Sequence, residues 1–304
     1  MKSKASNQTF GELFSKWVFI IATASSIVAL GFIIYFLFST AFPTIGEIGV
    51  TNFLFGKNWR PTFNPPEYGI LPMIVGSVYA TLGAIILGVP IGVFVAVYMA
   101  FYAPKKIYGI LKSGINLLAG IPSVVYGLFV LTNIVPLIRK YFGGQGLSLL
   151  AVILVLATMI LPTIISLSEA ALKAVPKQYY QGAIGLGASK ERAIFNVVIP
   201  AAKSGVLSSI VLGIGRAIGE TMAVAMVAGN QPIIPTSLLQ GMRTMTINVV
   251  LEMKYAGVEH QNALIATGAV LFVFILLINL VFNLLKKNMG NRSWIREKKL
   301  IQKY

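Results

Sequence analysis

One apolar stretch of the sequence, "GIGRAIGETMAVAMVAGN" (Gly213–Asn230), contains a cation and an anion four residues apart. On a continuous helix this i, i+4 spacing puts Arg216 and Glu220 on one face, where their side chains can pair. A charge at the centre of a bilayer costs about 2.5–3.5 kcal/mol on insertion scales, so both residues must face protein or water. The planar guanidinium of Arg216 suits an oxyanion such as phosphate, and Glu220 would hold the guanidinium in place.

A structural salt bridge between neighbouring helices is the competing interpretation of this pair. Gly213, Gly215 and Gly219 agree with both interpretations, because small residues let another membrane helix approach closely. Thr221 offers a further hydroxyl donor to a pathway, or it bonds back to its own helix. In either case we expect the pair to lie away from lipid.

The composition indicates an integral membrane protein and excludes several kinds of chemistry. Of the 304 residues, 56% are hydrophobic and only 11% are charged, whereas a soluble domain has about 25% charged residues. The chain has no Cys, no Asp and one His, which excludes thiol catalysis, a two-His metal site and a Ser-His-Asp triad. It also lacks a phosphate-binding GxxxxGK[ST] loop. We therefore expect no enzymatic activity and no cofactor, and we expect His260 to be a solvated side chain in an external loop.

Six segments are long and apolar enough to cross a bilayer, which takes about 20 residues. The sequence therefore predicts an all-α, polytopic membrane protein. The first segment follows Lys16 and lacks a cleavage site, so we interpret it as a span and not as a signal peptide. The predicted spans are Trp17–Thr40, Leu71–Phe101, Ile115–Ile138, Leu147–Leu167, Gly205–Ala228 and Ala263–Leu285.

The positive charges indicate how the chain is oriented. With the N-terminus inside, 18 Lys and Arg residues fall on the inside, and six fall on the outside: Lys57, Arg60, Arg139, Lys140, Arg243 and Lys254. This bias places both termini in the cytoplasm and explains the net charge of +16 without nucleic acid. We divide the chain into a cytoplasmic segment (1–16), the first span with a long external loop (17–70), a core (71–285) and a basic cytoplasmic tail (286–304).

The cytoplasmic segment between the fourth and fifth spans is too elaborate for a simple turn. Residues 176–203 read "PKQYYQGAIGLGASKERAIFNVVIPAAK", with Pro176 at the start and Pro200 near the end. The pattern predicts two short helices joined by a glycine turn and closed by Pro200. Its small residues favour a surface against which a partner presses, and an ordinary amphipathic loop is the alternative.

The spacing within this segment resembles the EAA loop of ABC-importer permeases, which runs E-A-A, three residues, Gly, nine residues, I-x-L-P. Gln181-Gly182-Ala183 stand in place of E-A-A, Gly187 takes the glycine position, and the segment ends on Val197, Ile199 and Pro200. The first two positions depart from the pattern. Glu169-Ala170-Ala171 spells E-A-A but lies at the wrong distance from Pro200, and we place it at the end of the fourth span.

Three further blocks resemble the PstC family of phosphate-importer permeases over about residues 17–285. They are "YGILPMIVGS" (Tyr68–Ser77), "PSVVYGLF" (Pro122–Phe129) and "GRAIGETMAV" (Gly215–Val224). The resemblance implies the type I ABC-importer permease architecture in a bacterial or archaeal cytoplasmic membrane. It also implies three kinds of partner: a second, PstA-type permease, two copies of a cytoplasmic ATPase that binds the ATP, and an extracytoplasmic phosphate-binding protein.

Two sites are predicted. The chemistry of the residues assigns a pathway to Arg216, Glu220 and Thr221, and the resemblance implies the second site. A cytoplasmic coupling helix would contact the ATPase through Gln181, Gly182, Ala183, Gly187, Ala188, Ser189, Glu191 and Pro200, with the charges of Lys190, Glu191 and Arg192 fixing its register.

Other functions stay open at this point. A permease for sulfate, molybdate or phosphonate would share the loop. A stand-alone secondary transporter would use an intramembrane carboxylate such as Glu220 for proton coupling, but the coupling-type loop argues against it. A membrane enzyme is disfavoured by the missing Asp and Cys.

Overall fold

The computed structural model describes the backbone of residues 10–301 and the side chains of residues 12–282 and 284. In this part the regular elements are helices and one hairpin of two short strands, β1 (Trp59–Arg60) and β2 (Glu67–Tyr68). The all-α, six-span prediction is confirmed. The segments able to cross a membrane are Glu12–Ile48, Leu71–Phe101, Ser123–Phe142, Leu149–Lys173, Lys190–Gly219 and Val258–Phe282. The side chains of the predicted tail, residues 286–304, lie outside the described residues.

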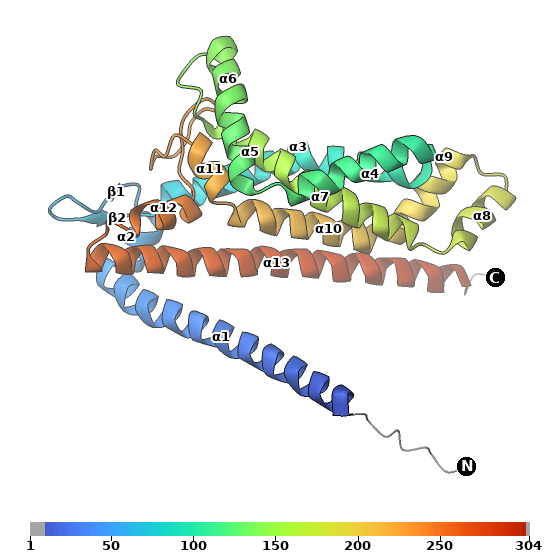
Figure 1. Ribbon diagram of the computed structural model, residues 1–304, viewed down its shortest axis with the longest axis horizontal. Coiled ribbons are helices and arrows are strands. Elements are labelled where there is room, and N and C mark those ends of the chain that lie inside the picture. The colour runs from blue at the N-terminus through green and yellow to red at the C-terminus, as the bar shows by residue number, and fades with distance from the viewer. Residues whose placement is uncertain (1–9, 302–304) are drawn as a thin grey trace.

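Four long helices run along one axis of the molecule (Figure 1): α3 (Leu71–Phe101), α7 (Leu149–Lys173), α10 (Ile199–Gly219) and α13 (Val258–Ile301). One end, here called the hairpin end, carries α2 (Val50–Phe55), the strands and α12 (Met245–Glu252). The opposite end, the coupling end, carries α8 (Lys177–Gly185) and α9 (Lys190–Ala193). Helix α13 ends at the coupling end (Figure 1).

The core forms around α7, which packs between α3 and α10. Glycines on the neighbouring helices receive isoleucines of α7: a Cβ on Gly88 would lie 2.7 Å from Ile160 Cδ1, and one on Gly92 would lie 2.7 Å from Ile164 Cγ2. A Cβ on Gly213 of α10 would lie 3.0 Å from Ile164 Cγ1. Lipid chains are as apolar as these side chains, so close packing, and not burial from water, holds the helices together.

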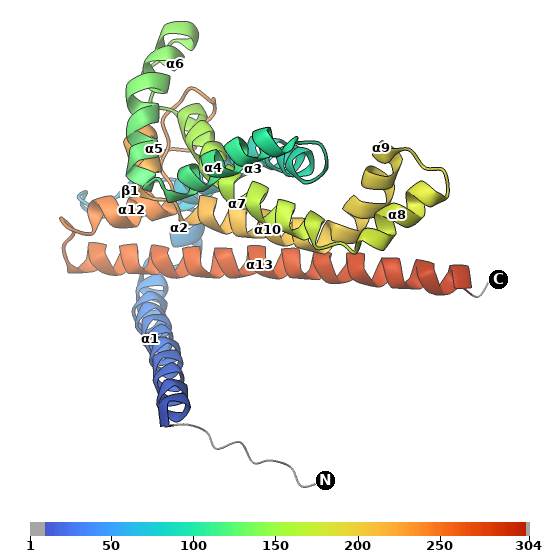
Figure 2. The same ribbon diagram turned by 45° about the vertical axis from the view of Figure 1, so that its right-hand side comes forward.

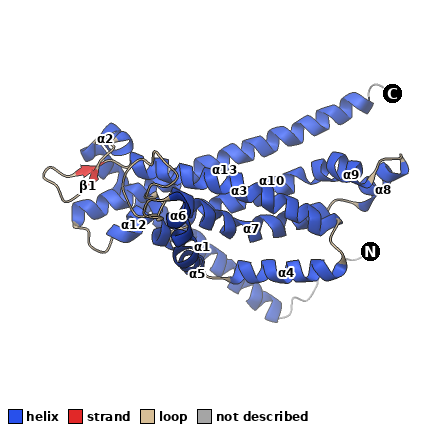
Figure 3. Cartoon of the chain, turned by 90° about the horizontal axis from the view of Figure 1, so that it is seen from above, coloured by secondary structure: helices blue, strands red, loops and turns tan. Residues whose placement is uncertain are grey.

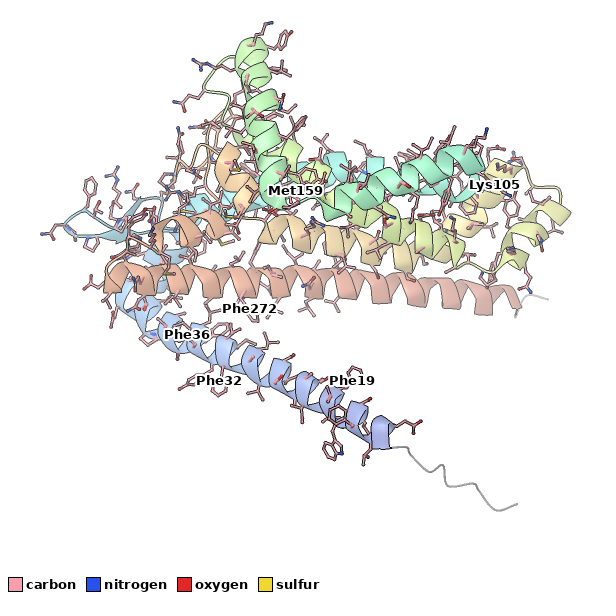
Figure 4. All side chains as sticks on the ribbon, viewed as in Figure 1. Phe19, Phe32, Phe36, Lys105, Met159 and Phe272 are labelled. Atoms are coloured by element: carbon pink, nitrogen blue, oxygen red, sulfur yellow. The ribbon has the colours of Figure 1, made fainter. Side chains whose placement is uncertain are left out.

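Helix α1 (Phe10–Ile48) leaves this bundle (Figures 1 and 2). It is longer than the predicted span and packs on α13 near its end, where Ala41 is buried and the rings of Phe38 and Phe272 meet edge to face, with centroids 6.1 Å apart. None of its most apolar window is buried. Figure 4 shows Phe19 and Phe32 on the part of α1 that has left the bundle.

The third span differs from the prediction of one helix over Ile115–Ile138. The chain forms a separate helix α4 (Lys105–Gly120), then α5 (Ser123–Phe129), a π-helical turn (Val130–Ile134) and α6 (Val135–Phe142). The break falls at Ile121, whose ψ of 128° is extended because a following proline disfavours the helical conformation. Helices α5 and α6 then rise steeply from the long axis (Figures 1 and 2), and Figure 3 shows α6 nearly end-on.

The fifth span also differs from the prediction of a single helix over Gly205–Ala228. A continuous helical segment begins at Lys190, passes through a π-helical turn (Ile194–Val198) and ends at Gly219. The backbone then becomes extended at Glu220, and a short helix α11 (Met222–Val227) follows. The predicted intramembrane ion pair therefore straddles a helix break.

Candidate functional site

The break after Gly219 separates Arg216 from Glu220. Arg216 lies in the last turn of α10, whereas Glu220 has an extended backbone (φ −70°, ψ 131°), and its Oε1 accepts a hydrogen bond of 3.1 Å from the backbone N–H of Ala223. The two side chains form no ion pair within 4.0 Å, although both are among the described residues. The predicted pairing on one helix face is wrong, because the chain leaves the helix before Glu220 and the start of α11 recruits its carboxylate.

Neighbouring hydroxyl groups donate hydrogen bonds to the backbone carbonyl groups at the break. Thr221 Oγ1 donates to the carbonyl of Gly219 at 3.3 Å, as the second of its two predicted roles requires. Thr246, in α12, donates through Oγ1 to the carbonyl of Glu220 at 3.1 Å. Helix α12 at the hairpin end therefore supports the break from outside the fifth span.

The "PSVVYGLF" segment lies against the same break. A Cβ on Gly127 of α5 would lie only 2.8 Å from Cα of Ala223 in α11, so glycine permits this contact. The adjacent Tyr126 donates through Oη to the carbonyl of Leu118 at 2.7 Å and thereby bridges the break between α4 and α5.

The resulting site combines a half-buried guanidinium, a half-buried carboxylate and a phenol hydroxyl. The guanidinium is a hydrogen-bond donor that can hold the oxygens of an anion, whereas the O–H of Tyr126 is already donated to the carbonyl of Leu118. Gly213 packs on α7, but a Cβ on Gly215 or Gly219 would meet nothing within 4 Å. The face of α10 next to Arg216 is therefore open to water or to a second subunit.

The predicted two helices and glycine turn at the coupling end are confirmed. Gly187 has φ +87°, which a residue with a Cβ rarely adopts. The N–H of Ala188 donates to the carbonyl of Ala183 at 3.0 Å, and the N–H of Gly187 donates to that of Ile184 at 2.9 Å. This is the Schellman arrangement that ends a helix at a left-handed glycine.

The turn presents its residues to solvent. Gln181, Gly182 and Glu191 are exposed, no residue of α8 is buried, and Leu186 is 92% exposed. Ser189 is occupied within the chain, because its Oγ accepts from the N–H of Arg192 at 3.3 Å and caps α9.

Two details of the coupling end differ from the predicted pattern. Pro200 does not close the segment but lies at the start of α10, inside a continuous helical stretch. A π-helical turn directly before it changes the local hydrogen-bond ladder, and such irregular turns let a residue without an N–H sit within a helix. Lys190 places its Nζ 4.3 Å from the ring centre of Tyr102, at the end of α3, and so joins α9 to the bundle.

Glu169, which lies outside the EAA-like spacing, has a structural role that the sequence did not predict. It is 2% exposed and accepts hydrogen bonds from Tyr108 Oη (2.7 Å) and Lys112 Nζ (2.7 Å) of α4 and from Lys173 Nζ (2.6 Å) of its own helix. Its signal in the sequence was an acid at the end of an apolar span with a lysine four residues later. The cluster fastens α4 to α7 near the coupling end.

His260 is not a solvated side chain, so that prediction is wrong. Only 15% of its side chain is exposed, and its Nε2 lies 2.9 Å from Glu252 Oε2. Glu252 also accepts from Trp59 Nε1 at 2.7 Å and pairs with Arg243. This hairpin-end network joins the loop after α1, the loop before α12 and the start of α13. Among the described residues, no three His or Glu side chains form a metal-binding group.

Comparison with known proteins identifies the family. Residues 88–293 match the model of the binding-protein-dependent transport system inner membrane component. The chain belongs to this family. It is 41% identical over 242 residues to the probable ABC transporter permease protein YqgH of Bacillus subtilis, covering 77% of this chain and 78% of the relative. It is 33% identical over 273 residues to the phosphate transport system permease protein PstC of Mesorhizobium japonicum, covering 83% of each chain.

Solved structures agree with the fold. A chain of the MetNI methionine ABC transporter in an inward-facing conformation aligns with a TM-score of 0.58 at 18% identity, covering 72% of this chain and 95% of that one. A chain of a bacterial alginate ABC transporter, solved with an alginate-bound periplasmic protein, aligns with a TM-score of 0.64 at 12% identity, covering 94% and 98%. The predicted type I ABC-importer permease architecture is thereby confirmed.

Replacing Glu169 tests its role in fastening α4. In Glu169→Ala, two lysines and a phenol lose their buried acceptor, and we expect the folded state to lose about 1–3 kcal/mol. Thermal unfolding of the purified protein in detergent should show a lower midpoint than in the wild type. Glu169→Gln keeps an acceptor for Tyr108 and should lose less. Glu191→Ala, at an exposed position, is the matched control, and an unchanged midpoint for Glu169→Ala would contradict the assignment.

Proposed function

We propose that this chain is a membrane permease subunit of an ATP-driven phosphate importer and forms half of its translocation pathway. The observation that carries the proposal is Arg216, a half-buried cation in the last turn of a membrane helix, on a face that Gly215 and Gly219 leave open. The names of those relatives that are phosphate permeases indicate the identity of the substrate. Family membership supplies the class of machine, because a binding-protein-dependent permease works with a cytoplasmic ATPase and an extracytoplasmic binding protein.

The orientation follows from the charge bias of the loops. We infer that the coupling end faces the cytoplasm and the hairpin end faces outward, since the excess of Lys and Arg belongs to the side of α8 and α9. An even number of spans then returns both termini to the cytoplasm. The membrane would be a bacterial or archaeal cytoplasmic membrane.

A second permease subunit of the PstA type would complete the pathway. Helix α1 exposes an apolar surface that nothing in the described chain covers along most of its length. The face of α10 with Gly215 and Gly219 is likewise open. A related subunit can cover such surfaces by close helix packing, and the pathway would then lie between the two subunits.

In the pathway, Arg216 would attract phosphate as it passes the break in the fifth span. A guanidinium binds phosphate oxygens through two parallel N–H bonds. The carboxylate of Glu220, held by the N–H of Ala223, stays near enough to limit how tightly the anion is retained. Thr221 contributes less, since its hydroxyl is engaged with Gly219.

Coupling to the ATPase would occur at the α8–α9 turn. An exposed leucine on the cytoplasmic side, Leu186, suits an apolar groove in a partner. ATP itself would be bound by the ATPase, so this chain needs no cofactor. Closure of the ATPase dimer would move the turn, and contacts such as Lys190 with Tyr102 would pass the motion to α3.

Uptake by the reconstituted complex tests the proposed function. Liposomes that contain both permeases and the ATPase, supplied with the binding protein, should accumulate labelled phosphate only when ATP is present at the ATPase side. Excess sulfate, molybdate or phosphonate should not compete. Transport of one of these anions in place of phosphate would keep the permease assignment and refute the substrate.

Removing the charge of Arg216 tests its place in the pathway. In the double variant Arg216→Gln, Glu220→Gln, we expect uptake to fall about ten- to hundredfold, because a charge-assisted contact with the anion is lost. Gel filtration should show that the complex still assembles. The single variant Glu220→Gln is the control, since its amide oxygen can still accept from Ala223. Full uptake by the double variant would leave the structural interpretation standing.

A negative charge in the α8–α9 turn tests coupling. In Gly187→Asp, ATP hydrolysis should no longer drive uptake, although the protein still inserts and assembles. Gly187→Asn is the matched control, because asparagine has nearly the same shape, tolerates positive φ and carries no charge. Full transport by Gly187→Asp would contradict the proposed role of the turn.

A further inference from the structure

A cavity of about 510 Å³ opens at the hairpin end, between the end of α1, α2, the strand β2 and the start of α13. We call it the outer pocket and define it by Glu47, Lys57, Glu67, Tyr68, Glu259 and Asn262, which are among its lining residues. It shares no lining residue with the site around Arg216, and neither the EAA-like loop nor the helix break explains it.

The charges around the outer pocket are unsuited to phosphate. Three carboxylates line it, those of Glu47, Glu67 and Glu259, against one ammonium group from Lys57. All three glutamates are exposed. Glu67 is partly engaged, because its Oε1 accepts from Asn58 Nδ2 at 3.3 Å and its Oε2 lies 4.0 Å from Nε of Arg60, so the charges of Glu47 and Glu259 act most strongly on whatever approaches. An anion is repelled there, whereas a cation is attracted.

One residue that lines the pocket, Tyr68, has a hydroxyl group without a hydrogen-bond partner among the described residues. Tyr68 is only 9% exposed. Burial and the nearby charge of Glu259 raise the pKa of this phenol, so it stays a neutral O–H. A hydroxyl without a partner in the lining of an open cavity is an acceptor available to an incoming N–H donor.

The size of the site points to the end of a long side chain. The carboxylates border a wide cavity, and among the described residues they do not converge as a group able to hold a metal ion. A guanidinium or ammonium group on a flexible stem is larger than a bare ion and can reach from the rim to the phenol. The acceptors that line the pocket are those to which such a group donates.

Packing holds the pocket in shape. The rings of Trp59 and Tyr68 meet edge to face with centroids 5.7 Å apart, and the ring of His260 lies 6.3 Å from that of Tyr68. Glu252 fixes Trp59 and His260 from behind. The phenol is therefore positioned before any partner arrives, which lowers the entropic cost of binding.

We propose that the outer pocket receives a lysine or arginine side chain of the extracytoplasmic binding protein when that protein docks. The inference rests on the proposed function for the identity of the partner and for the side of the membrane. It adds the place of one docking contact, its polarity and the residues that form it.

Affinity measurements on the assembled complex test this inference. With the complex in nanodiscs and the phosphate-loaded binding protein titrated onto it, Glu47→Gln with Glu259→Gln should weaken Kd about tenfold and flatten its dependence on salt. Tyr68→Phe should weaken Kd about threefold by removing one acceptor. Lys57→Gln removes the opposing charge and should tighten Kd. Lys140→Gln, at an exposed position on α6, is the matched control and should leave Kd unchanged.

Several results would overturn the inference. An unchanged Kd in an assembled double glutamine variant would show that the pocket does not face the binding protein. Loss of the second permease from that variant would assign the pocket to the subunit interface. An effect of the double variant that disappears when phosphatidylethanolamine is replaced by a lipid without an ammonium headgroup would assign the pocket to a lipid headgroup. A wild-type complex that binds its binding protein with the predicted charge dependence but imports another anion would refute the phosphate function and leave the pocket intact.

Discussion

The bilayer tolerates no unpaired backbone groups, and the break after Gly219 exists only because its surroundings meet that demand. The carboxylate of Glu220 satisfies the N–H of Ala223, and Thr246 satisfies the carbonyl of Glu220 itself. The first bond is local, but the second requires that α12 return to the break, so the loop between α11 and α12 must lead the chain back there. Irregular backbone inside a membrane protein is found where it lines a cavity or is buried in protein. The break is therefore both the main structural constraint on the fifth span and the reason that Arg216 stands at the end of a helix.

The need to pair polar groups within the chain also explains why one part of it, the helices α3, α4, α7 and α10, is rigidly packed. Glycine–isoleucine contacts lock α3, α7 and α10 together, and Glu169 ties α4 to α7 with buried charge-assisted bonds. Separating α4 from α7 would leave the buried carboxylate of Glu169 without part of its compensating charge. We therefore expect α4 and the end of α7 to move as one body. Lys190 connects α9 to the end of α3 in a similar way. A displacement of the coupling end is thus transmitted to the core helices α3 and α7 through short side-chain contacts and not through flexible loops.

Composition and hydropathy were enough to predict the six spans, because a long apolar run has few alternatives to a membrane helix. The glycine turn at Gly187 was predictable too, since its spacing and its αL requirement are both local. The two helix breaks were not, although the Pro122 signal was present. An apolar run hides a kink, and one hydroxyl that satisfies the break, that of Thr246, lies 26 residues after Glu220 in the sequence. The roles of His260 and Glu169 also depend on residues far away in the sequence. Their partners, Trp59 and Tyr108, are brought to them by the fold.

The surfaces that remain uncovered share one physical logic. The apolar length of α1, the open face of α10, the exposed Leu186 and the acidic rim of the outer pocket each leave something unsatisfied within this chain. What is missing differs by location. Helices α1 and α10 lack apolar packing within the membrane, Leu186 lacks an apolar groove on the side of α8, and the outer pocket lacks positive charge. A single-chain transporter has no reason to keep these four surfaces uncovered. The proposed subunit accounts for all of them, because a second permease would cover both α1 and α10, the ATPase would receive Leu186 and the binding protein would supply positive charge.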